Sequence, residues 1–396
     1  MIRVLELYCG IGGVAAALGM HRPGGAEHDG ADSGAAEIVA AVDLDRTALA
    51  VYAANFPGPT VPRNLDRAAA GDLAVHRADL WTMSPPCQPY TRRGLRRDLE
   101  DPRAASFVAL VAALDAVRPP YLFLENVPGF AGSRAHALLR ETLDRAGYEV
   151  GERLLCPSEL GSPNRRRRFY LVASREGRLT WPAEGGPRED RPPRLEPAEV
   201  GCPGGGQGDD RRGTGPTLPR RPLADFVASH ADPELTVAAA TVAAYRHALD
   251  VVDAADPAAV TACFTAAYGR SPVRSGSYLR IGSDGGPGDS TGEALPALRR
   301  FSPREVLALL GFPASYRLPP ELSRATGWRL AGNSLSLPPV RALLTSLPPL
   351  AHLGGAAAEA TGPPRPARAA AATSPAPLRR RGATLRRLTA PVAEPG

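Results

Sequence analysis

The sequence contains no lysine, so all 47 of its basic residues are arginine. Together with 41 glycines and 42 prolines, this indicates a compositional bias and not selection for phosphate binding. The net charge of +6 is also local, because residues 352–396 hold seven arginines and two glutamates. The remaining 40 basic residues are balanced by 39 acidic ones. Overall charge therefore does not identify a nucleic-acid-binding protein, and only local arginine clusters can do so.

Cysteine is scarce, and no long apolar run occurs. The five cysteines form no CxxC pair, which argues against a disulfide scaffold and a zinc site; they are Cys9, Cys87, Cys156, Cys202 and Cys263. No stretch reaches the roughly 18 apolar residues of a membrane helix. Residues 2–7 resemble a strand and not a secretory signal. We therefore expect a cytoplasmic protein with reduced thiols, which needs no membrane or metal and acts as a monomer.

Short apolar segments alternate with segments rich in alanine and leucine over residues 1–175. The segments typical of strands are Ile2–Tyr8, Ile38–Val42, Asp79–Ser84, Tyr121–Leu124 and Arg168–Ala173. Between them, Ala104–Val117 and Ala135–Ala146 have the composition of helices that pack on a sheet. This alternation predicts an α/β fold with a mostly parallel sheet.

The alternation stops after about residue 175. From about residue 184 to 221, Gly, Pro, Arg and Asp predominate without apolar periodicity, which predicts a loop-rich or disordered insertion. Partial helix is expected in Asp225–Val252, renewed structure at Ala262–Tyr268, and a helix over Ser302–Leu310 with Ser302 as its N-cap. A last helix should follow Pro339, and an Ala/Pro/Arg tail beyond about residue 353 should be disordered.

A glycine-rich turn follows the first expected strand. Residues 5–13 read Leu-Glu-Leu-Tyr-Cys-Gly-Ile-Gly-Gly, a pattern that lets a ligand approach the backbone at a helix N-terminus. The next strand ends at Asp43, where a carboxylate can accept hydrogen bonds from ribose hydroxyls. Gly10, Gly12 and Ala15 also fit a looser dinucleotide pattern. An NAD-dependent dehydrogenase therefore stays open, as does a tight turn that binds nothing.

A cysteine-bearing loop follows the strand Asp79–Met83. Residues 84–92 read Ser-Pro-Pro-Cys-Gln-Pro-Tyr-Thr-Arg, and the two prolines hold the chain extended before Cys87. Parallel α/β sheets bind ligands at this edge. Nearby positive charge favours the reactive thiolate, and the loop continues into four candidate nucleic-acid contacts: Arg92, Arg93, Arg96 and Arg97. The alternative is a cysteine that only fills space in the core.

Two further polar segments lie next to buried strands. Glu125 ends the run Leu122–Leu124, where burial can raise the pKa of its carboxyl group, although it can also cap the following helix. Four consecutive arginines, 165–168, precede another strand. The period of two places Arg166 and Arg168 on one face of that strand, whereas a solvated charge run is the plainer interpretation.

A thiol, a carboxylic acid and cations together suit one reaction. Carbon 5 of cytosine is too weak a nucleophile to attack a sulfonium methyl group. Addition of a thiolate to carbon 6, with an acid at ring N3, moves electron density onto carbon 5. Carbon 5 then takes the methyl group and loses its proton as the thiolate leaves. The base must first leave its stack to reach such a pocket.

In this order the motifs resemble those of the cytosine-C5 methyltransferase family, over residues 1–175 and about 261–347. The resemblance implies a Rossmann-like, S-adenosylmethionine-dependent methyltransferase fold with a small target-recognition region. It implies Cys87 as the nucleophile, Glu125 as the acid at N3, and Arg166 with Arg168 as orienting cations. It places S-adenosylmethionine at Leu7, Gly10, Ile11, Gly12, Gly13, Asp43, Leu44, Asn64, Leu65, Asn333 and Ser334.

Several details indicate a branch of this family. Asn164 stands where most DNA-acting members have glutamine, and the segments 85–92, 160–164 and 263–269 are similar to the subfamily that methylates the anticodon loop of transfer RNA. The resemblance therefore implies a tRNA methyltransferase. A DNA cytosine-C5 methyltransferase, regulatory or paired with a restriction enzyme, is the alternative, and a binding protein without catalysis is another. Cys263 is assigned no chemical step.

The expected domain order follows from these observations. A catalytic domain should cover residues 1–175, and a target-recognition region with the low-complexity insertion should cover 176–295. Residues 296–350 should return to the catalytic domain, and 351–396 should form the tail. The arginines of the tail either add non-specific affinity for phosphate or only keep the chain soluble.

Overall fold

The computed structural model describes residues 1–20, 36–90, 97–181, 219–228, 232–282 and 295–353. The chain divides into two compact units, Met1–Thr361 and Gly362–Gly396, and every described residue belongs to the first. The predicted tail beyond residue 353 and nearly all of the predicted insertion lie outside the described residues. The same holds for Arg92, Arg93, Arg96 and Cys202.

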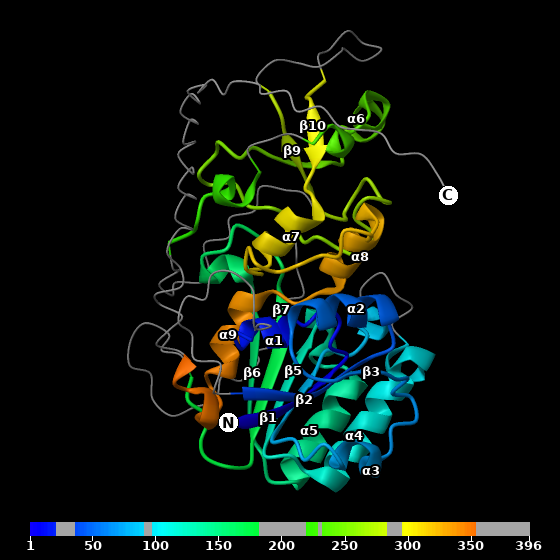
Figure 1. The fold of residues 1–396 in the computed structure, drawn as a ribbon, viewed down its shortest axis with the longest axis vertical. Coiled ribbons are helices and arrows are strands. Elements are labelled where there is room, and N and C mark those ends of the chain that lie inside the picture. Colours follow the sequence, from blue (N-terminus) through cyan, green and yellow to red (C-terminus); the bar gives the residue numbers. More distant parts are fainter. Residues whose placement is uncertain (21–35, 91–96, 182–218, 229–231, 283–294, 354–396) are drawn as a thin grey trace, which may run out of the picture. The chain divides into compact units, whose positions relative to one another are not determined.

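A seven-stranded sheet occupies the lower part of the view in Figure 1, with the strand order β3-β2-β1-β4-β5-β7-β6. Only β7 runs antiparallel to its neighbours, β5 and β6, whereas the pairs among β1 to β5 are parallel. The predicted α/β fold with a mostly parallel sheet is confirmed. The strands are β1 (Ile2–Leu7), β2 (Ala36–Asp43), β3 (Thr60–Pro62), β4 (Leu80–Met83), β5 (Tyr121–Asn126), β6 (Glu149–Leu155) and β7 (Arg168–Ser174).

Five of these strands coincide with predicted segments, and the two at the edges of the sheet were not predicted. β3 has three residues, and most side chains of β6 are half-buried. An edge strand buries less of its surface than a central one, so it lacks the continuous apolar run by which central parallel strands are found. β5 also continues through Glu125 and Asn126, two residues beyond the predicted end.

Helices cover both faces of the sheet because successive strand residues point to opposite sides. Leu5 and Leu7 of β1 pack in one hydrophobic cluster with α3, α4 and α5, which Figure 1 shows together on one side. Ile2 and Val4 pack in a second cluster with α1, α2 and α9. These helices are α1 (Gly13–Ala17), α2 (Arg46–Asn55), α3 (Ala70–Ala74), α4 (Ala105–Val117), α5 (Arg134–Arg145) and α9 (Leu337–Leu344).

A smaller three-stranded sheet has the order β10-β9-β8 and packs with α6 (Ala239–Tyr245) around a separate apolar cluster. Its strands are β8 (Asp250–Val252), β9 (Ser277–Arg280) and β10 (Leu298–Arg300). The predicted partial helix within 225–252 is confirmed at α6, although the end of that segment is a strand.

The predicted helix after Ser302 is confirmed as α7 (Pro303–Leu309), in which Ser302 and Glu305 form a capping box. α8 (Arg324–Asn333) follows. The predicted last helix is α9, which begins two residues before Pro339 because prolines are tolerated in a first helical turn. Among the described residues, no helix is both long and apolar enough to cross a membrane.

Candidate active site

The carboxyl edge of the large sheet brings the predicted chemical groups together. Cys87 follows β4, and Glu125 lies near the end of the adjacent strand β5. Arg168 begins β7, which runs antiparallel beside β5, so its side chain reaches the same edge. This is the edge at which open α/β sheets bind ligands.

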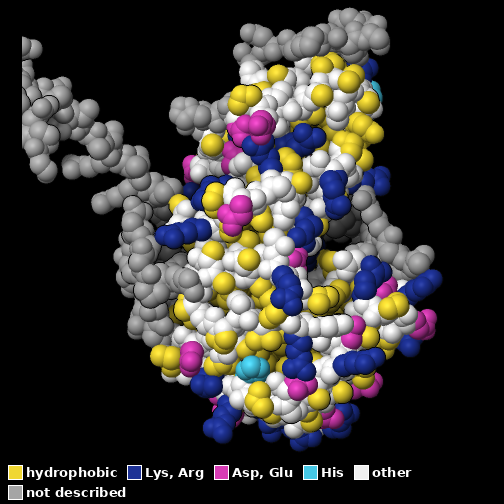
Figure 2. Space-filling model, turned by 45° about the vertical axis from the view of Figure 1, so that its right-hand side comes forward, with side chains coloured by type: hydrophobic (Ala, Val, Ile, Leu, Met, Phe, Trp, Pro, Cys, Tyr) yellow, Lys and Arg dark blue, Asp and Glu magenta, His cyan; other side chains and the backbone are white. Residues whose placement is uncertain are grey.

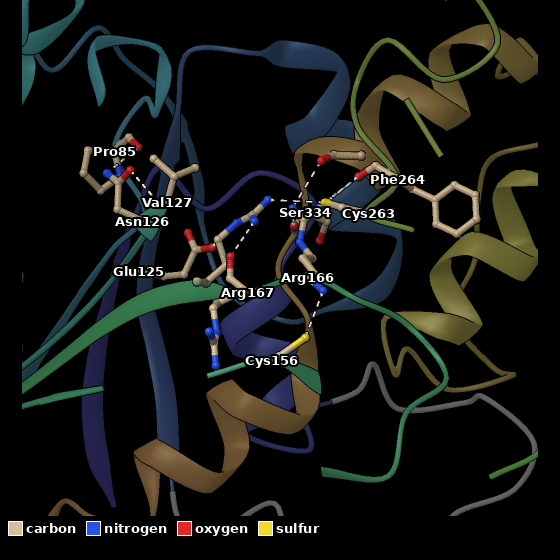
Figure 3. A network of polar contacts seen from close by, with 12 residues as sticks. Pro85, Glu125, Asn126, Val127, Cys156, Arg166, Arg167, Cys263, Phe264 and Ser334 are labelled. Carbon is tan, nitrogen blue, oxygen red and sulfur yellow. Dashed lines mark hydrogen bonds and ion pairs between the residues drawn. The ribbon is translucent and has the colours of Figure 1, made fainter. Parts of the chain in front are cut away.

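The loop that carries Cys87 is fastened on both sides. Asn126 donates its side-chain N–H to the carbonyl oxygen of Pro85 at 3.3 Å, as Figure 3 shows. Ser84 donates its hydroxyl to the carbonyl oxygen of Tyr8 at 2.9 Å. Cys87 is half-buried, and its loop is therefore held between the glycine turn after β1 and the end of β5. Sequence reasoning missed Asn126, although a polar residue at the end of a buried strand was a visible signal.

Glu125 and Arg168 form an ion pair, with 3.3 Å between Oε1 and Nε. Burial raises the pKa of the Glu125 carboxyl group, and the positive charges of Arg168 and Arg166 only partly oppose this. Glu125 is therefore more easily protonated than an exposed glutamate, which suits a group that donates a proton or hydrogen bond.

The resting state of Cys87 differs from the expectation of a stabilised thiolate. Burial raises the pKa of its thiol, the charge of Arg168 opposes the shift, and Glu125 adds to it. Arg97 is the one member of the predicted cluster 92–97 that the structure describes, and it is exposed. At neutral pH the thiol of Cys87 is therefore predominantly protonated.

Arg166 joins three separate segments of the chain. It is 4% exposed and donates to the carbonyl oxygen of Phe264 at 2.9 Å and to Sγ of Cys263 at 3.5 Å. Its other terminal nitrogen donates to the carbonyl oxygens of Gly332, at 3.2 Å, and Ser334. Figure 3 shows this side chain pointing between the segments of Cys263 and Ser334. Arg166 therefore has mainly backbone partners, whereas Arg168 has the carboxylate.

The predicted alternation of the arginine run is confirmed. Arg166 is buried and Arg168 half-buried, whereas Arg165 and Arg167 are exposed. Elsewhere on the face that Figure 2 shows, arginine side chains are scattered among acidic ones and form no single patch. This distribution agrees with the compositional origin of the arginines.

Cys263 is a second thiol of this site. Both Arg166 and Arg168 donate to its Sγ, at 3.5 Å and 3.7 Å. Burial raises the pKa of this thiol, but the two guanidinium charges and their hydrogen bonds outweigh burial and lower it. Within the described ranges, no group of three or more His, Cys, Asp or Glu side chains could hold a metal ion.

The glycine turn leaves room for a ligand on one side and is closely packed on the other. Gly10 and Gly12 have φ angles of 53° and 87°, which favour glycine. A Cβ on Gly12 would lie 2.3 Å from the ring of Phe56, whereas a Cβ on Gly10 would meet no atom within 4 Å. Asp43 accepts the N–H of Gly10 at 2.8 Å. Leu44 is 67% exposed, which places an apolar surface beside this carboxylate.

The segment that holds the predicted residues Asn333 and Ser334 lies against the same turn. A Cβ on Gly13 would come within 2.8 Å of the side chain of Leu335, so this segment packs closely on the start of α1. Asn333 is exposed and Ser334 buried. Two further residues predicted to bind the methyl donor differ in exposure. Leu65 is buried, whereas Asn64 is exposed and forms a local turn with Asp66.

Comparison with known proteins accounts for this arrangement. The family model "C-5 cytosine-specific DNA methylase" matches residues 2–195. A tRNA (cytosine(38)-C(5))-methyltransferase from Spodoptera frugiperda is 31% identical, and the match covers 87% of this chain and 98% of that protein. The chain belongs to the cytosine-C5 methyltransferase family.

Two further similarities extend over most of this methyltransferase. A DNA (cytosine-5)-methyltransferase from Dictyostelium discoideum is 28% identical, with 87% of this chain and 94% of that protein covered. The crystal structure of the S. pombe Dnmt2 methyltransferase matches with a TM-score of 0.66 and 27% identity, covering 87% of this chain and 97% of that one. The predicted family and the Rossmann-like methyltransferase fold are both confirmed.

Two residues that support the glycine turn of this methyltransferase were not predicted. Glu6, in β1, accepts the hydroxyl of Tyr52 at 2.9 Å and the N–H of Val14 at 3.3 Å, and burial raises its pKa to about 8. Tyr316 donates its hydroxyl to the carbonyl oxygen of Ile11 at 2.7 Å. Glu6 could have been noticed as a charged residue inside an apolar strand. Tyr316 lies 305 residues from its partner and gives no local signal.

Proposed function

We propose that this enzyme methylates carbon 5 of a cytosine in transfer RNA through a covalent bond between Cys87 and carbon 6. The observation that carries the proposal is the position of Cys87 beside the buried Glu125–Arg168 pair at one sheet edge. A nucleophile and an acid at adjacent strand ends are what addition to a cytosine ring needs.

The residues divide the reaction between them. Cys87 loses its thiol proton to solvent, and the thiolate adds to carbon 6 while the protonated form of Glu125, which burial favours, supplies a proton to ring N3. Arg168 holds the carboxyl group in place through its Nε. The electron pair displaced by the sulfur makes carbon 5 nucleophilic. After carbon 5 is methylated, the N3 proton returns to Glu125. Solvent then takes the proton of carbon 5, and the electron pair of that C–H bond restores the double bond to carbon 6 and expels the thiolate.

The glycine turn fits S-adenosylmethionine. When bound, this donor supplies the electrophilic methyl group. The open space at Gly10 allows a ligand to approach the backbone. Each carboxylate oxygen of Asp43 accepts one backbone N–H, from Gly10 or Asp45, and a carboxylate oxygen has a further lone pair for a ribose hydroxyl. The exposed side chain of Leu44 offers an apolar surface to an adenine ring. Asn333, exposed at the end of α8, would complete the site from the C-terminal segment.

Transfer RNA is favoured as the substrate by the relative from Spodoptera frugiperda, whose name specifies tRNA and which this chain matches over nearly its full length. The Cys-Phe-Thr segment at 263–265 supports the same choice, because it is similar to that of the subfamily that methylates transfer RNA. DNA is the second candidate, since the relative from Dictyostelium is named for it.

Incorporation of labelled methyl groups into total tRNA and into DNA, assayed in parallel, tests the substrate. Label in tRNA is expected, and label in DNA alone would reverse the choice. RNA that contains 5-fluorocytosine tests the mechanism, because fluorine at carbon 5 cannot leave as a proton does and the adduct persists. The adduct should map to Cys87 by peptide mass spectrometry. Cys87→Ser should abolish turnover and keep affinity for the methyl donor, whereas an adduct on Cys263 would contradict the assignment.

A further inference from the structure

Asn164 fastens the arginine run to the segment that begins at Thr261. Its side chain is 0% exposed and donates to Oγ1 of Thr261 at 2.9 Å and to the carbonyl oxygen of Ala262 at 3.1 Å. Two backbone hydrogen bonds of 2.9 Å flank these contacts, from Arg165 N–H to the carbonyl of Thr261 and from Thr261 N–H to the carbonyl of Pro163. The two segments thus form a short parallel bridge.

The orientation of the Asn164 amide follows from its partners. The hydroxyl of Thr261 donates to the carbonyl oxygen of Pro163 at 3.0 Å, so toward Asn164 it acts as an acceptor. The carbonyl of Ala262 can only accept. Both partners therefore require the N–H₂ side of the amide, and among the described residues Oδ1 is left buried without a hydrogen-bond partner. An unpaired buried acceptor is costly, which indicates that the two donated bonds matter here.

This bridge fixes which residues of the two segments face one another. Arg166 lies two residues after Asn164, and its partners Cys263 and Phe264 lie two and three residues after Thr261. A shift of one residue along the bridge would remove Arg166 from the carbonyl of Phe264. Arg168 lies two residues further on and carries the contact with Glu125.

We propose that Asn164 is a positioning residue that sets the register between the arginine run and residues 261–264, and through it the placement of Arg166 and Arg168. Within the part of the chain that the structure describes, the side chain of Asn164 bonds to Thr261 and Ala262 and not to Cys87 or Glu125, so it acts through the two arginines. The register between the two segments does not depend on the substrate, whereas the effect of Asn164 on methyl transfer rests on the proposed function.

Substitutions at two positions separate this role from general support of the fold. Asn164→Asp keeps the shape but turns an oxygen toward the carbonyl of Ala262, and Asn164→Gln keeps the amide but lengthens the side chain by one methylene. Thr261→Val removes the acceptor, and Thr261→Ser is the matched control that keeps it. We expect the single-turnover rate of methyl transfer to fall about 10- to 100-fold in the Asp, Gln and Val variants, as for a misplacement of about 1 Å. Thr261→Ser should retain it, with little change in melting temperature. The Asp, Gln and Val variants disrupt buried hydrogen bonds and should melt at a lower temperature, but their dissociation constants for the methyl donor should change little.

A second readout needs no catalysis. Alkylation of Cys263 by iodoacetamide, followed over pH by peptide mass spectrometry, reports how well Arg166 and Arg168 stabilise its thiolate. The midpoint should move to higher pH in Asn164→Asp and Thr261→Val and stay in place in Thr261→Ser. Wild-type rates and an unchanged Cys263 profile in the Asp and Val variants would overturn the proposal, as would equal losses of rate and donor affinity. A wild-type enzyme that methylates neither tRNA nor DNA would overturn the proposed function alone, because the Cys263 profile would still test Asn164.

Discussion

Glu6→Gln should make the folded protein more stable at alkaline pH and leave it nearly unchanged in acid. Glu6 is 2% exposed beneath the glycine turn, and burial raises the pKa of its carboxyl group from 4.5 to about 8. Between these values the folded chain holds a proton that the unfolded chain has lost. Stability therefore falls as pH rises through this window, since the folded state binds more protons than the unfolded one.

The size of this effect follows from the shift. A difference of one pKa unit corresponds to about 1.4 kcal/mol, so a shift from 4.5 to about 8 corresponds to about 5 kcal/mol across the window. Entry of water or rearrangement around the ionised carboxylate reduces this value, and we expect about 2–5 kcal/mol. Glutamine can keep both contacts, because its oxygen accepts the N–H of Val14 and its N–H₂ donates to the hydroxyl oxygen of Tyr52.

Urea unfolding at pH 5 and at pH 8.5 measures the difference. The wild type should lose stability relative to Glu6→Gln between these two pH values. Glu37→Gln is the matched control, because Glu37 lies on the neighbouring strand but is exposed and pairs with Arg3 at 3.4 Å. Parallel pH dependences of the wild type and Glu6→Gln would refute the reasoning and show that Glu6 is ionised in the folded protein.

Two further predictions concern the turn and the acid. Gly12→Ala should weaken binding of the methyl donor at least tenfold in calorimetry and lower the melting temperature. The φ of 87° at this position is strained for alanine, and the added Cβ would lie 2.3 Å from the ring of Phe56. Gly19→Ala controls for backbone strain alone, because Gly19 also has a positive φ but has open space around it. Glu125→Gln should lower the single-turnover rate about 10²- to 10⁴-fold and change its pH profile. The wild-type rate should be flat at pH values between the raised pKa of Glu125 and the raised pKa of Cys87, and it should fall above the pKa of Cys87. The rate of the variant should instead rise with pH up to the pKa of Cys87, because only the thiol still titrates. Identical pH profiles would contradict the role of Glu125.

The central strands could be predicted because their signal is local. β1, β4, β5 and β7 are buried on both faces, so each is mostly apolar in the sequence. The loops after them could then be placed at one edge, which is why Cys87 and Glu125 were found near each other. The edge strands β3 and β6 lack that signal, and only the pairing of the whole sheet reveals them.

The partners of the site residues could not be predicted, because they are distant in sequence. Arg166 contacts the carbonyl of Gly332, 166 residues away, and a period of two along a strand says only which face a side chain takes. Periodicity correctly separated Arg166 and Arg168 from their neighbours, but it could not show that one arginine binds backbone carbonyls and the other a carboxylate. The raised pKa of Cys87 was missed for the same reason, since burial is a property of the assembled fold.

The C-terminal segment links the two halves of the proposed reaction. On the donor side, Tyr316 bonds to the carbonyl of Ile11, and Leu335 packs against Gly13. On the target side, the carbonyl of Ser334 accepts from Arg166. Because Ser334 and Leu335 are adjacent, a displacement of this segment has to affect the glycine turn and the arginine together. The residues to which we assign the chemistry all lie before residue 175, yet the contacts that hold Arg166 come in part from residues 332 and 334.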